Sequence, residues 1–277
     1  MKITSECYPC LNRLVYQAAE LATDDPELRQ KAIQKGLDLL ERSFSLSKTS
    51  IAVATPLHRV IREITGNPDP YLKMKEAEVA MALALGPDFG PRGSLRDEMI
   101  LAVHGNSIDF FKGMDEIRAD LGAPVRFAID HVAALESKLE HASRILYLAD
   151  NTGEVFFDLR LMWRLGRFGE VTYVVKESPV QNDVTLADLE RFGLRRYLSR
   201  VITTGTDTPG VDMDLASEEF KREFASADLV LAKGMGYWET LSELPPQGKV
   251  FHLLKAKCMP VARSLNVPLN SYVALLR

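Results

Sequence analysis

The sequence predicts an α/β protein: a three-layer α/β/α sandwich with a mainly parallel sheet, plus an all-helical N-terminal subdomain. Beyond residue 143, short apolar runs rich in β-forming residues alternate with helical segments, as in a parallel sheet covered by helices on both faces. Between residues 10 and 85, apolar residues recur at three- and four-residue steps and no strand-like run appears. We therefore expect a helical subdomain over 1–95 and a Rossmann-like α/β domain over 96–277.

Length and charge narrow the class of protein. The chain has 277 residues and a net charge of −4, with both signs mixed along it. It is long enough to bury a core without disulfides. No basic face favours nucleic acid, no apolar run approaches the ~20 residues of a membrane span, and the first residues lack a signal-peptide core. We expect a cytoplasmic protein with a small-molecule partner, while composition leaves the oligomeric state open.

The N-terminal part reads as four helices joined by short turns. Turn-forming residues follow the first helix at Asp24-Asp25-Pro26, and Thr65-Gly66-Asn67-Pro68 ends the third. A break is expected inside the third helix at Thr55-Pro56, because proline removes a backbone donor. The predicted helices span residues 10–22, 26–40, 47–65 and 71–85.

A polar interruption occurs in the helical segment 95–111, which follows a Gly- and Pro-rich loop at 86–92. The segment contains Gly105-Asn106-Ser107-Ile108-Asp109, and the glycine alone costs a helix about 1 kcal/mol. Such a departure from local rules is expected at functional sites. The alternative is a simple helix end, with Asn106 or Ser107 capping the next helix.

The second half alternates between strands and helices. Right-handed crossovers bring the carboxyl ends of parallel strands to one edge of the sheet. The predicted strands span residues 145–149, 171–176, 200–203, 229–232 and 250–254. The helices between and after them are expected near residues 155–167, 185–192, 217–225, 238–244 and 259–265.

Polar residues follow these strands where ligands bind in such folds. Asp150 and Asn151 follow the first strand, Asp183 the second and Lys233 the fourth. Three oxygen-bearing side chains suit Mg²⁺ or Mn²⁺, and a lysine beside glycines suits phosphate. We also expect Gly153 to let the backbone approach a ligand. The combination predicts metal-assisted hydrolysis of a phosphomonoester.

Each of these residues also has a purely structural interpretation. Asp150 and Asn151 are suited to cap the next helix, Asp183 to cap the helix near Thr185, and Lys233 to lie at the surface in a glycine turn. Their common position at one edge of the predicted sheet favours the functional interpretation. No segment has the glycine spacing of a P-loop or a dinucleotide fingerprint.

The three cysteines, Cys7, Cys10 and Cys258, leave two alternatives open. The spacing of Cys7 and Cys10 is that of half a zinc site, to which Cys258 would add a third ligand and His252 or one of the other four histidines a fourth. Buried free thiols are the other alternative, because cysteine packs well as a small core residue.

Taken in order, the motifs resemble the DUF89 family of metal-dependent damage-control phosphatases, in particular its prokaryotic branch with an N-terminal Cys-x-x-Cys. The matching segments are Cys7-Tyr-Pro-Cys10, Asp69-Pro-Tyr71, Gly105 to Asp109, Asp150-Asn-Thr-Gly-Glu154, Asn182-Asp-Val-Thr185, Lys233-Gly-Met-Gly236 with Glu239, and Leu254-Lys-Ala-Lys-Cys258. The resemblance implies an α/β/α sandwich, a divalent metal among Mg, Mn, Ni and Co, and hydrolysis of small phosphorylated metabolites such as sugar phosphates.

The resemblance also implies roles for individual residues. Its metal ligands fall on Asp150, Asn151 and Asp183. Its catalytic residues fall on Asp150, on Asn106 and Lys233 as phosphate contacts, and on Asp109 and Glu154 near the substrate or the metal waters. A second metal is implied as an option at Cys7, Cys10 and Cys258.

The chain departs from the family pattern after the Lys-Gly loop, where Tyr237 and Trp238 follow Gly236. Two large aromatic residues at this position either narrow the pocket or belong to the core. Two other functions stay open on the sequence alone: a non-catalytic metal- or metabolite-binding protein, and a carboxyl methyltransferase.

Overall fold

The computed structural model describes residues 1–85, 93–107, 119 and 122–277. The predicted loop at 86–92 and the predicted site residue Asp109 lie outside this described part.

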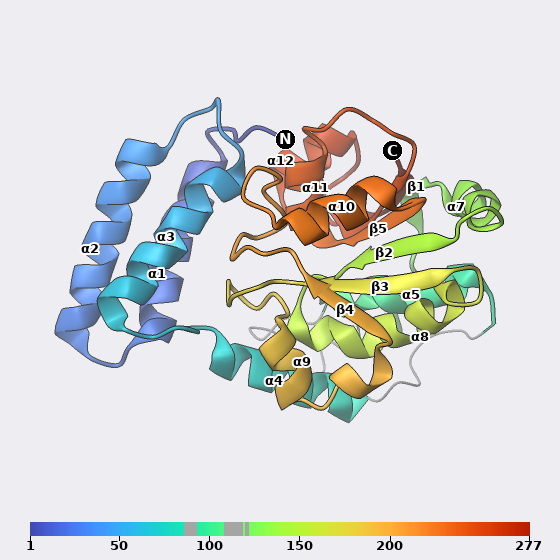
Figure 1. Cartoon of the computed structure of the whole chain (residues 1–277). Coiled ribbons are helices and arrows are strands. Elements are labelled where there is room, and N and C mark those ends of the chain that lie inside the picture. Colours follow the sequence, from blue (N-terminus) through green and yellow to red (C-terminus); the bar gives the residue numbers. More distant parts are fainter. Residues whose placement is uncertain (86–92, 108–118, 120–121) are drawn as a thin grey trace.

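A seven-stranded sheet forms the centre of the described chain, in the order β1-β7-β6-β5-β2-β3-β4 (Figure 1). The five strands from β2 to β6 are mutually parallel. β7 runs antiparallel to β6, and β1 pairs with β7 in parallel, so both run against the other five. The strands are β1 (Phe127–Asp130), β2 (Arg144–Leu148), β3 (Glu170–Val175), β4 (Arg200–Thr203), β5 (Leu229–Lys233), β6 (Val250–Lys255) and β7 (Tyr272–Leu276).

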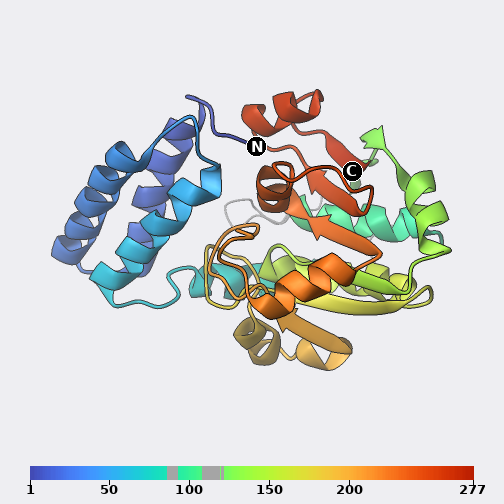
Figure 2. The same ribbon diagram turned by 45° about the horizontal axis from the view of Figure 1, so that its top comes forward.

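Helices cover both faces of this sheet, which confirms the predicted three-layer sandwich (Figures 1 and 2). One face packs against α5 (Leu95–His104), α7 (Val132–Leu139), α8 (Val155–Leu165) and α9 (Leu186–Arg191). The other face packs against α10 (Glu218–Ser226), α11 (Gly234–Leu241) and α12 (Met259–Leu265). Short 3₁₀ turns are η1 (Gly105–Ser107), η2 (Thr152–Glu154) and η3 (Arg195–Tyr197).

The first four helices are α1 (Cys7–Ala22), α2 (Pro26–Ser43), α3 (Ser50–Thr65) and α4 (Leu72–Leu85). The first three pack around an apolar cluster that Met74 of α4 also joins, to one side of the sheet (Figure 1). α4 leads from them to the sheet, where Ala82 and Leu85 pack against Leu101 of α5 and Phe157 of α8. The division between residues 95 and 96 stays a prediction.

The break predicted at Pro56 is absent, because α3 runs without interruption from Ser50 to Thr65. Proline inside a helix costs roughly 3 kcal/mol. Here Val53, Leu57 and Ile61 of the same helix are fully buried against the neighbouring helices. Burial of these side chains contributes roughly 1.5–3 kcal/mol each, which outweighs the missing hydrogen bond.

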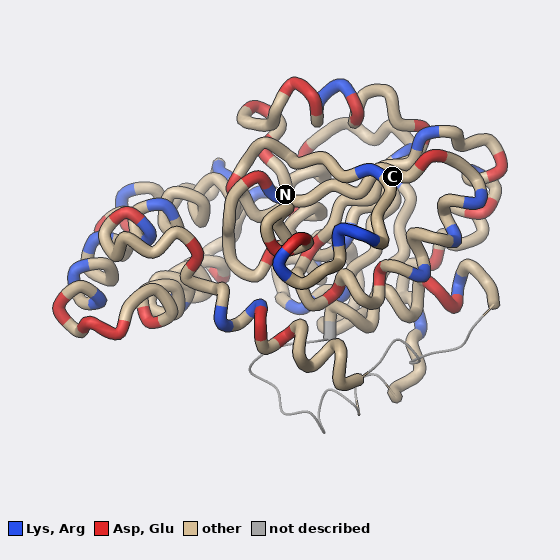
Figure 3. The backbone as a smooth tube through the Cα atoms, turned by 60° about the horizontal axis from the view of Figure 1, so that its bottom comes forward, with Lys and Arg blue, Asp and Glu red and all other residues tan. Residues whose placement is uncertain are grey.

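Charged residues of both signs are interspersed along the described chain (Figure 3). The helices within that part of the chain include none with the length and apolar character needed to cross a bilayer.

Candidate functional site

Backbone hydrogen bonds join the two loops that carry the predicted metal ligands. Val184 N–H donates to the carbonyl of Asp150 at 2.9 Å, and Thr152 N–H donates to the carbonyl of Asn182 at 2.9 Å. Between these bonds, Asn151 and Asp183 form an isolated β-bridge. Asp150, Asn151 and Asp183 therefore meet in one place, at the carboxyl ends of β2 and β3.

A cavity of about 150 Å³ lies beside these three residues. Four of the predicted site residues border it: Asn106, Asp150, Asn151 and Asp183. The rest of its lining comes from the loops after β3 and β4, from the first turn of α11, and from the end of β6 and the loop after it, namely Gln181, Pro209, Gly210, Gly234, Met235, Gly236, Lys255 and Lys257. Lys255 and Lys257 thus bring positive charge to a cavity that also has two carboxylates.

Asp150 is crowded by other acids and by backbone. Burial raises its pKa well above the ordinary value, and the charges of Glu154 and Asp183 add to this, against a smaller opposing effect of Lys233 and Lys257. Gly234 has φ +79°, and a Cβ there would lie 1.9 Å from Oδ2 of Asp150. Only glycine allows this approach, which explains the glycine directly after β5.

The oxygen atoms of the other two predicted ligands are partly fixed. Asn151 Nδ2 donates to Oε1 of Glu154 at 2.7 Å, which orients the amide and leaves its Oδ1 without a described hydrogen-bond partner. Asp183 is 4% exposed, and its Oδ2 lies 3.4 Å from Nζ of the buried Lys176. Burial raises the pKa of Asp183, and Lys176 opposes that rise.

These residues fit a hard divalent cation. Two carboxylates and one amide offer only oxygen, and waters complete the coordination of such an ion in protein sites. The described residues include no group of three His, Cys, Asp or Glu side chains placed to hold a metal. A site here thus depends on Asn151 as its third protein ligand. The mutual repulsion that raises the pKa of Asp150 is what a bound cation would relieve.

Lys233 lies away from the cavity lining, in the interior between β5 and α8. Its ammonium group donates to Glu154 at 2.9 Å, to Asp158 at 2.8 Å and to the carbonyl of Ala102 at 2.9 Å. Burial opposes its charge, but the carboxylates of Asp158 and Glu154 raise its pKa above the ordinary value. All three ammonium protons are thus engaged, and the phosphate contact predicted for Lys233 stays a prediction.

Glu154 connects this buried lysine with the cavity. It is 1% exposed and accepts hydrogen bonds from Lys233, Asn151 and Asn106. Asn106 lies in η1, is 2% exposed, and its Oδ1 is buried without a described partner. Glu154 therefore orients two amides that border the cavity, although it does not line the cavity itself.

Sequence reasoning missed two buried charged residues of this network, Asp158 and Lys176. Asp158 is fully buried on α8, three residues after Val155 on the apolar face, and a charge at such a position is the signal that would have revealed it. Lys176 directly follows β3 and donates to Tyr237 Oη at 3.0 Å and to the carbonyl of Gly210.

The role expected for Gly153 was wrong. A Cβ at this position would lie 2.9 Å from Cβ of Glu78 and 3.3 Å from its backbone, so the glycine admits helix α4 rather than a ligand. The side chain of Asn182 also contacts α4, because its Nδ2 donates to Oε1 of Glu78 at 2.8 Å.

Tyr237 and Trp238 belong to the core. Tyr237 is fully buried with its hydroxyl against Lys176, and Trp238 is 7% exposed with its indole N–H donating to Ser264 at 2.8 Å. Neither residue borders the cavity, so they do not narrow it.

The cysteines are free thiols in the structure. Burial, with smaller contributions from Glu239, Cys7 and Cys10, raises the pKa of the Cys258 thiol to about 11. Cys7 and Cys10 lie at the start of α1, and Cys258 directly precedes α12. No three ligands of the described chain are placed to hold an ion there, and a second metal at the cysteines stays a prediction.

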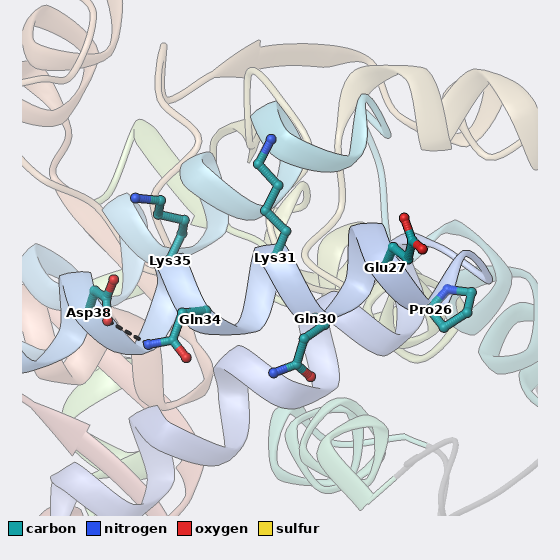
Figure 4. Close-up of a pocket in the computed structure, with 7 residues that line it drawn as sticks. All are labelled: Pro26, Glu27, Gln30, Lys31, Gln34, Lys35 and Asp38. Atoms are coloured by element: carbon teal, nitrogen blue, oxygen red, sulfur yellow. Dashed lines mark hydrogen bonds between the residues drawn. The ribbon is translucent and has the colours of Figure 1, made fainter.

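A larger hollow of about 700 Å³ lies on the outer side of α2 (Figure 4). All of its lining comes from this one helix, and the residues drawn are Pro26, Glu27, Gln30, Lys31, Gln34, Lys35 and Asp38. None of the predicted site residues borders it. The smaller cavity beside Asp150 is therefore the candidate site.

Comparison with known proteins shows the family of the chain. The family described as Damage-control phosphatase ARMT1-like domain matches residues 3–273. A damage-control phosphatase of Pyrococcus horikoshii is 34% identical over 99% of this chain and 98% of its own length. A protein of Archaeoglobus fulgidus, also named damage-control phosphatase, is 33% identical over 99% of both chains.

The fold is shared as well. The crystal structure of a DUF89 family protein from Pyrococcus horikoshii superposes with a TM-score of 0.89 at 34% identity, covering 100% of this chain and 99% of the other. These likenesses extend over both the helical part and the sheet.

Proposed function

Because the chain belongs to the damage-control phosphatases of the ARMT1-like (DUF89) family, we propose that the cavity beside Asp150 is where it hydrolyses small phosphomonoesters. The enzyme is a phosphatase; its site residues, metal and substrate are the subject of the proposal. One observation supports it: the two hydrogen-bonded loops carry two carboxylates and an amide that border a cavity whose lining also includes Lys255 and Lys257.

In this proposal Asp150, Asn151 and Asp183 hold one divalent ion, with Mg, Mn, Ni and Co as the options. When bound, the ion makes a water molecule nucleophilic and offsets negative charge on the phosphoryl group. Hydrolysis then breaks the phosphorus–oxygen bond of the ester and yields an alcohol and inorganic phosphate.

The chain's own residues bind and orient the ester. Lys255 and Lys257 offer ammonium groups to the phosphoryl oxygens, and Asn106 offers the amide N–H that Glu154 leaves unused. Glu154 holds Asn106 and Asn151 in place, and Lys233 holds Glu154. The proposal includes three further points. Asp109 acts near the substrate, sugar phosphates are among the substrates, and the enzyme is located in the cytoplasm.

Replacing Lys255 by methionine tests the phosphate contact. Lys255 is half-buried beside the Tyr272 ring, so methionine keeps the packing and removes the charge. We expect kcat/KM for p-nitrophenyl phosphate with Mn²⁺ to fall roughly 10- to 100-fold, because a hydrogen bond to a charged group contributes about 1.5–3 kcal/mol. Steady-state kinetics measures the change.

The matched control is Lys35→Met on α2, where the lysine is exposed and the helix contributes no residue to the cavity beside Asp150. This variant should keep wild-type kcat/KM. Equal kinetics for the two variants would refute the phosphate contact of Lys255. A wild-type protein that hydrolyses no phosphomonoester with any of the four ions would refute the proposed function.

Metal affinity should rise with pH. The pKa values of Asp150 and Asp183 are raised in the folded protein. The metal-free folded state therefore keeps protons that the unfolded state loses above about pH 4. The stability of the metal-free protein falls as the pH rises above this value. A cation competes with protons for these carboxylates, and below the raised pKa each proton displaced changes the binding free energy of the ion by about 1.4 kcal/mol per pH unit. Calorimetric titration with Mn²⁺ at pH 6 and pH 7.5 measures this.

The variant Asp183→Asn has one carboxylate fewer and should show a weaker dependence on pH. An affinity for Mn²⁺ that is the same at both pH values would contradict displacement of protons from these carboxylates.

A further inference from the structure

Gln181 borders the cavity but is neither one of the proposed metal ligands nor one of the proposed phosphate contacts. It precedes the Asn182-Asp183 pair, is half-buried, and borders the cavity. Its side-chain amide makes no hydrogen bond with the described residues. A neutral group that both donates and accepts is thus available at the wall of a cavity that also has two carboxylates and two lysines.

The backbone of Gln181 is strained. Its φ is +46°, a region that residues other than glycine rarely adopt. The two other non-glycine residues of the described chain with positive φ, Asn266 and Asn270, are asparagines, which tolerate this conformation. Glutamine lacks that advantage, so the turn at Gln181 costs free energy that its surroundings must offset. Strain of this kind is typical of functional sites.

Contacts from the helical part hold the chain on both sides of this turn. Arg62 of α3 donates to the carbonyl of Pro179, and Glu78 of α4 accepts from Asn182 Nδ2 at 2.8 Å. Thr152 N–H binds the carbonyl of Asn182 from the other ligand-bearing loop at 2.9 Å. The residues before and after Gln181 are thereby fixed, and the turn is kept at the cavity wall.

The lining of the cavity divides by chemistry. Asp150 and Asp183 serve the metal, and Lys255 and Lys257 serve the phosphoryl group in the proposed function. The lining also includes the neutral amide of Gln181 and the apolar residues Pro209 and Met235. The volume of about 150 Å³ is below the roughly 300–1,000 Å³ that is typical of pockets for drug-sized ligands. An ester with a short organic part fits such a space.

We propose that Gln181 is a specificity-determining residue that hydrogen-bonds hydroxyl groups on the organic part of the substrate, so that the enzyme prefers short hydroxylated phosphomonoesters. This inference rests on the proposed function and deepens it. The contacts on both sides of the turn keep Gln181 at the cavity wall, where its amide is available to the organic part of the ester.

The test compares two competitive inhibitors of p-nitrophenyl phosphate turnover that differ only in two hydroxyl groups, glycerol 3-phosphate and propyl phosphate. The wild-type enzyme should bind glycerol 3-phosphate more tightly. Gln181→Ala and Gln181→Gly should both raise the inhibition constant of glycerol 3-phosphate about 3- to 10-fold, the effect of one neutral hydrogen bond, and leave that of propyl phosphate unchanged.

The pair of variants separates the side chain from the backbone. Alanine removes the amide and keeps the strain, whereas glycine removes both. Equal effects on the inhibition constant point to the amide. The matched control is Gln34→Ala on α2, whose amide bonds only Asp38 among its described neighbours, and it should change neither constant (Figure 4).

The proposal is refuted if the wild-type enzyme binds both inhibitors equally, if the variants weaken both inhibitors to the same extent, or if only the alanine variant has an effect. Failure of the proposed function has a different signature, namely no turnover in the wild-type protein. In that case calorimetric dissociation constants of the same two compounds replace inhibition constants, and the same criteria decide on Gln181.

Discussion

Replacing Asp150 by asparagine should lower turnover of p-nitrophenyl phosphate by more than about a hundredfold, since groups that only support metal ligands already cost roughly 10- to 100-fold. Asparagine has the same shape and lacks the charge that binds a cation. The fold should be retained, because burial and two neighbouring acids already disfavour the Asp150 charge in the metal-free protein. Metal-free Asp150→Asn should therefore be at least as stable as the wild type.

Two measurements are needed: kcat with saturating Mn²⁺ and the unfolding midpoint without metal. Asp38→Asn, on the exposed side of α2, is the matched control and should change neither quantity. Near-normal activity in Asp150→Asn would show that this carboxylate does not hold the metal. A large loss of stability would show that it has a structural role beyond the site.

The second large effect is expected on stability. Lys233→Met leaves the buried carboxylates of Glu154 and Asp158 without their common partner. Breaking a buried ion pair by removing one partner costs about 3–5 kcal/mol, and we expect a loss of this size in the free energy of unfolding. Adding Asp158→Asn removes one of the orphaned charges and should recover part of the loss. Urea denaturation of the single and double variants measures both effects.

Lys221→Met provides the comparison at the surface. Its ammonium group pairs with Glu218 at 3.0 Å within α10, where Glu218 is highly exposed. Exposed pairs of this kind contribute about 0.3–0.5 kcal/mol. If Lys233→Met were no more destabilising than Lys221→Met, and kcat/KM fell instead, Lys233 would be a phosphate contact, as the family resemblance implied.

The parallel part of the sheet was predictable because its strands are buried on both faces. β2, β3 and β5 appear in the sequence as largely apolar runs. Such runs can be recognised as strands without knowing which strands lie beside them. β1, α7 and β7 were not predicted. β1 has only four residues with alternating burial, and β7 is partly exposed at both ends, so neither shows the long apolar run of a central strand.

The ligand-bearing loops could be placed at one edge because strand direction alone decides it. Asp150, Asn151 and Asp183 do meet beside a cavity, as expected. The partners of Lys233 were beyond sequence reasoning, because Ala102, Glu154 and Asp158 are separated from it by 131, 79 and 75 positions. Direction along a strand places a residue at an edge, but tertiary contacts decide whether its side chain faces the cavity or the interior.

The close approach of α4 to Gly153 bears on how this enzyme can change over time. The helix backbone rests against the loop that holds Asp150 and Asn151, with no room for a methyl group between them. A chain that lost its first helices, or exchanged them for an unrelated module, would uncover this loop and deprive Asn182 of Glu78. We therefore expect the helical part and the sheet to be inherited together, because the loop with Asp150 and Asn151 depends on contacts with α4.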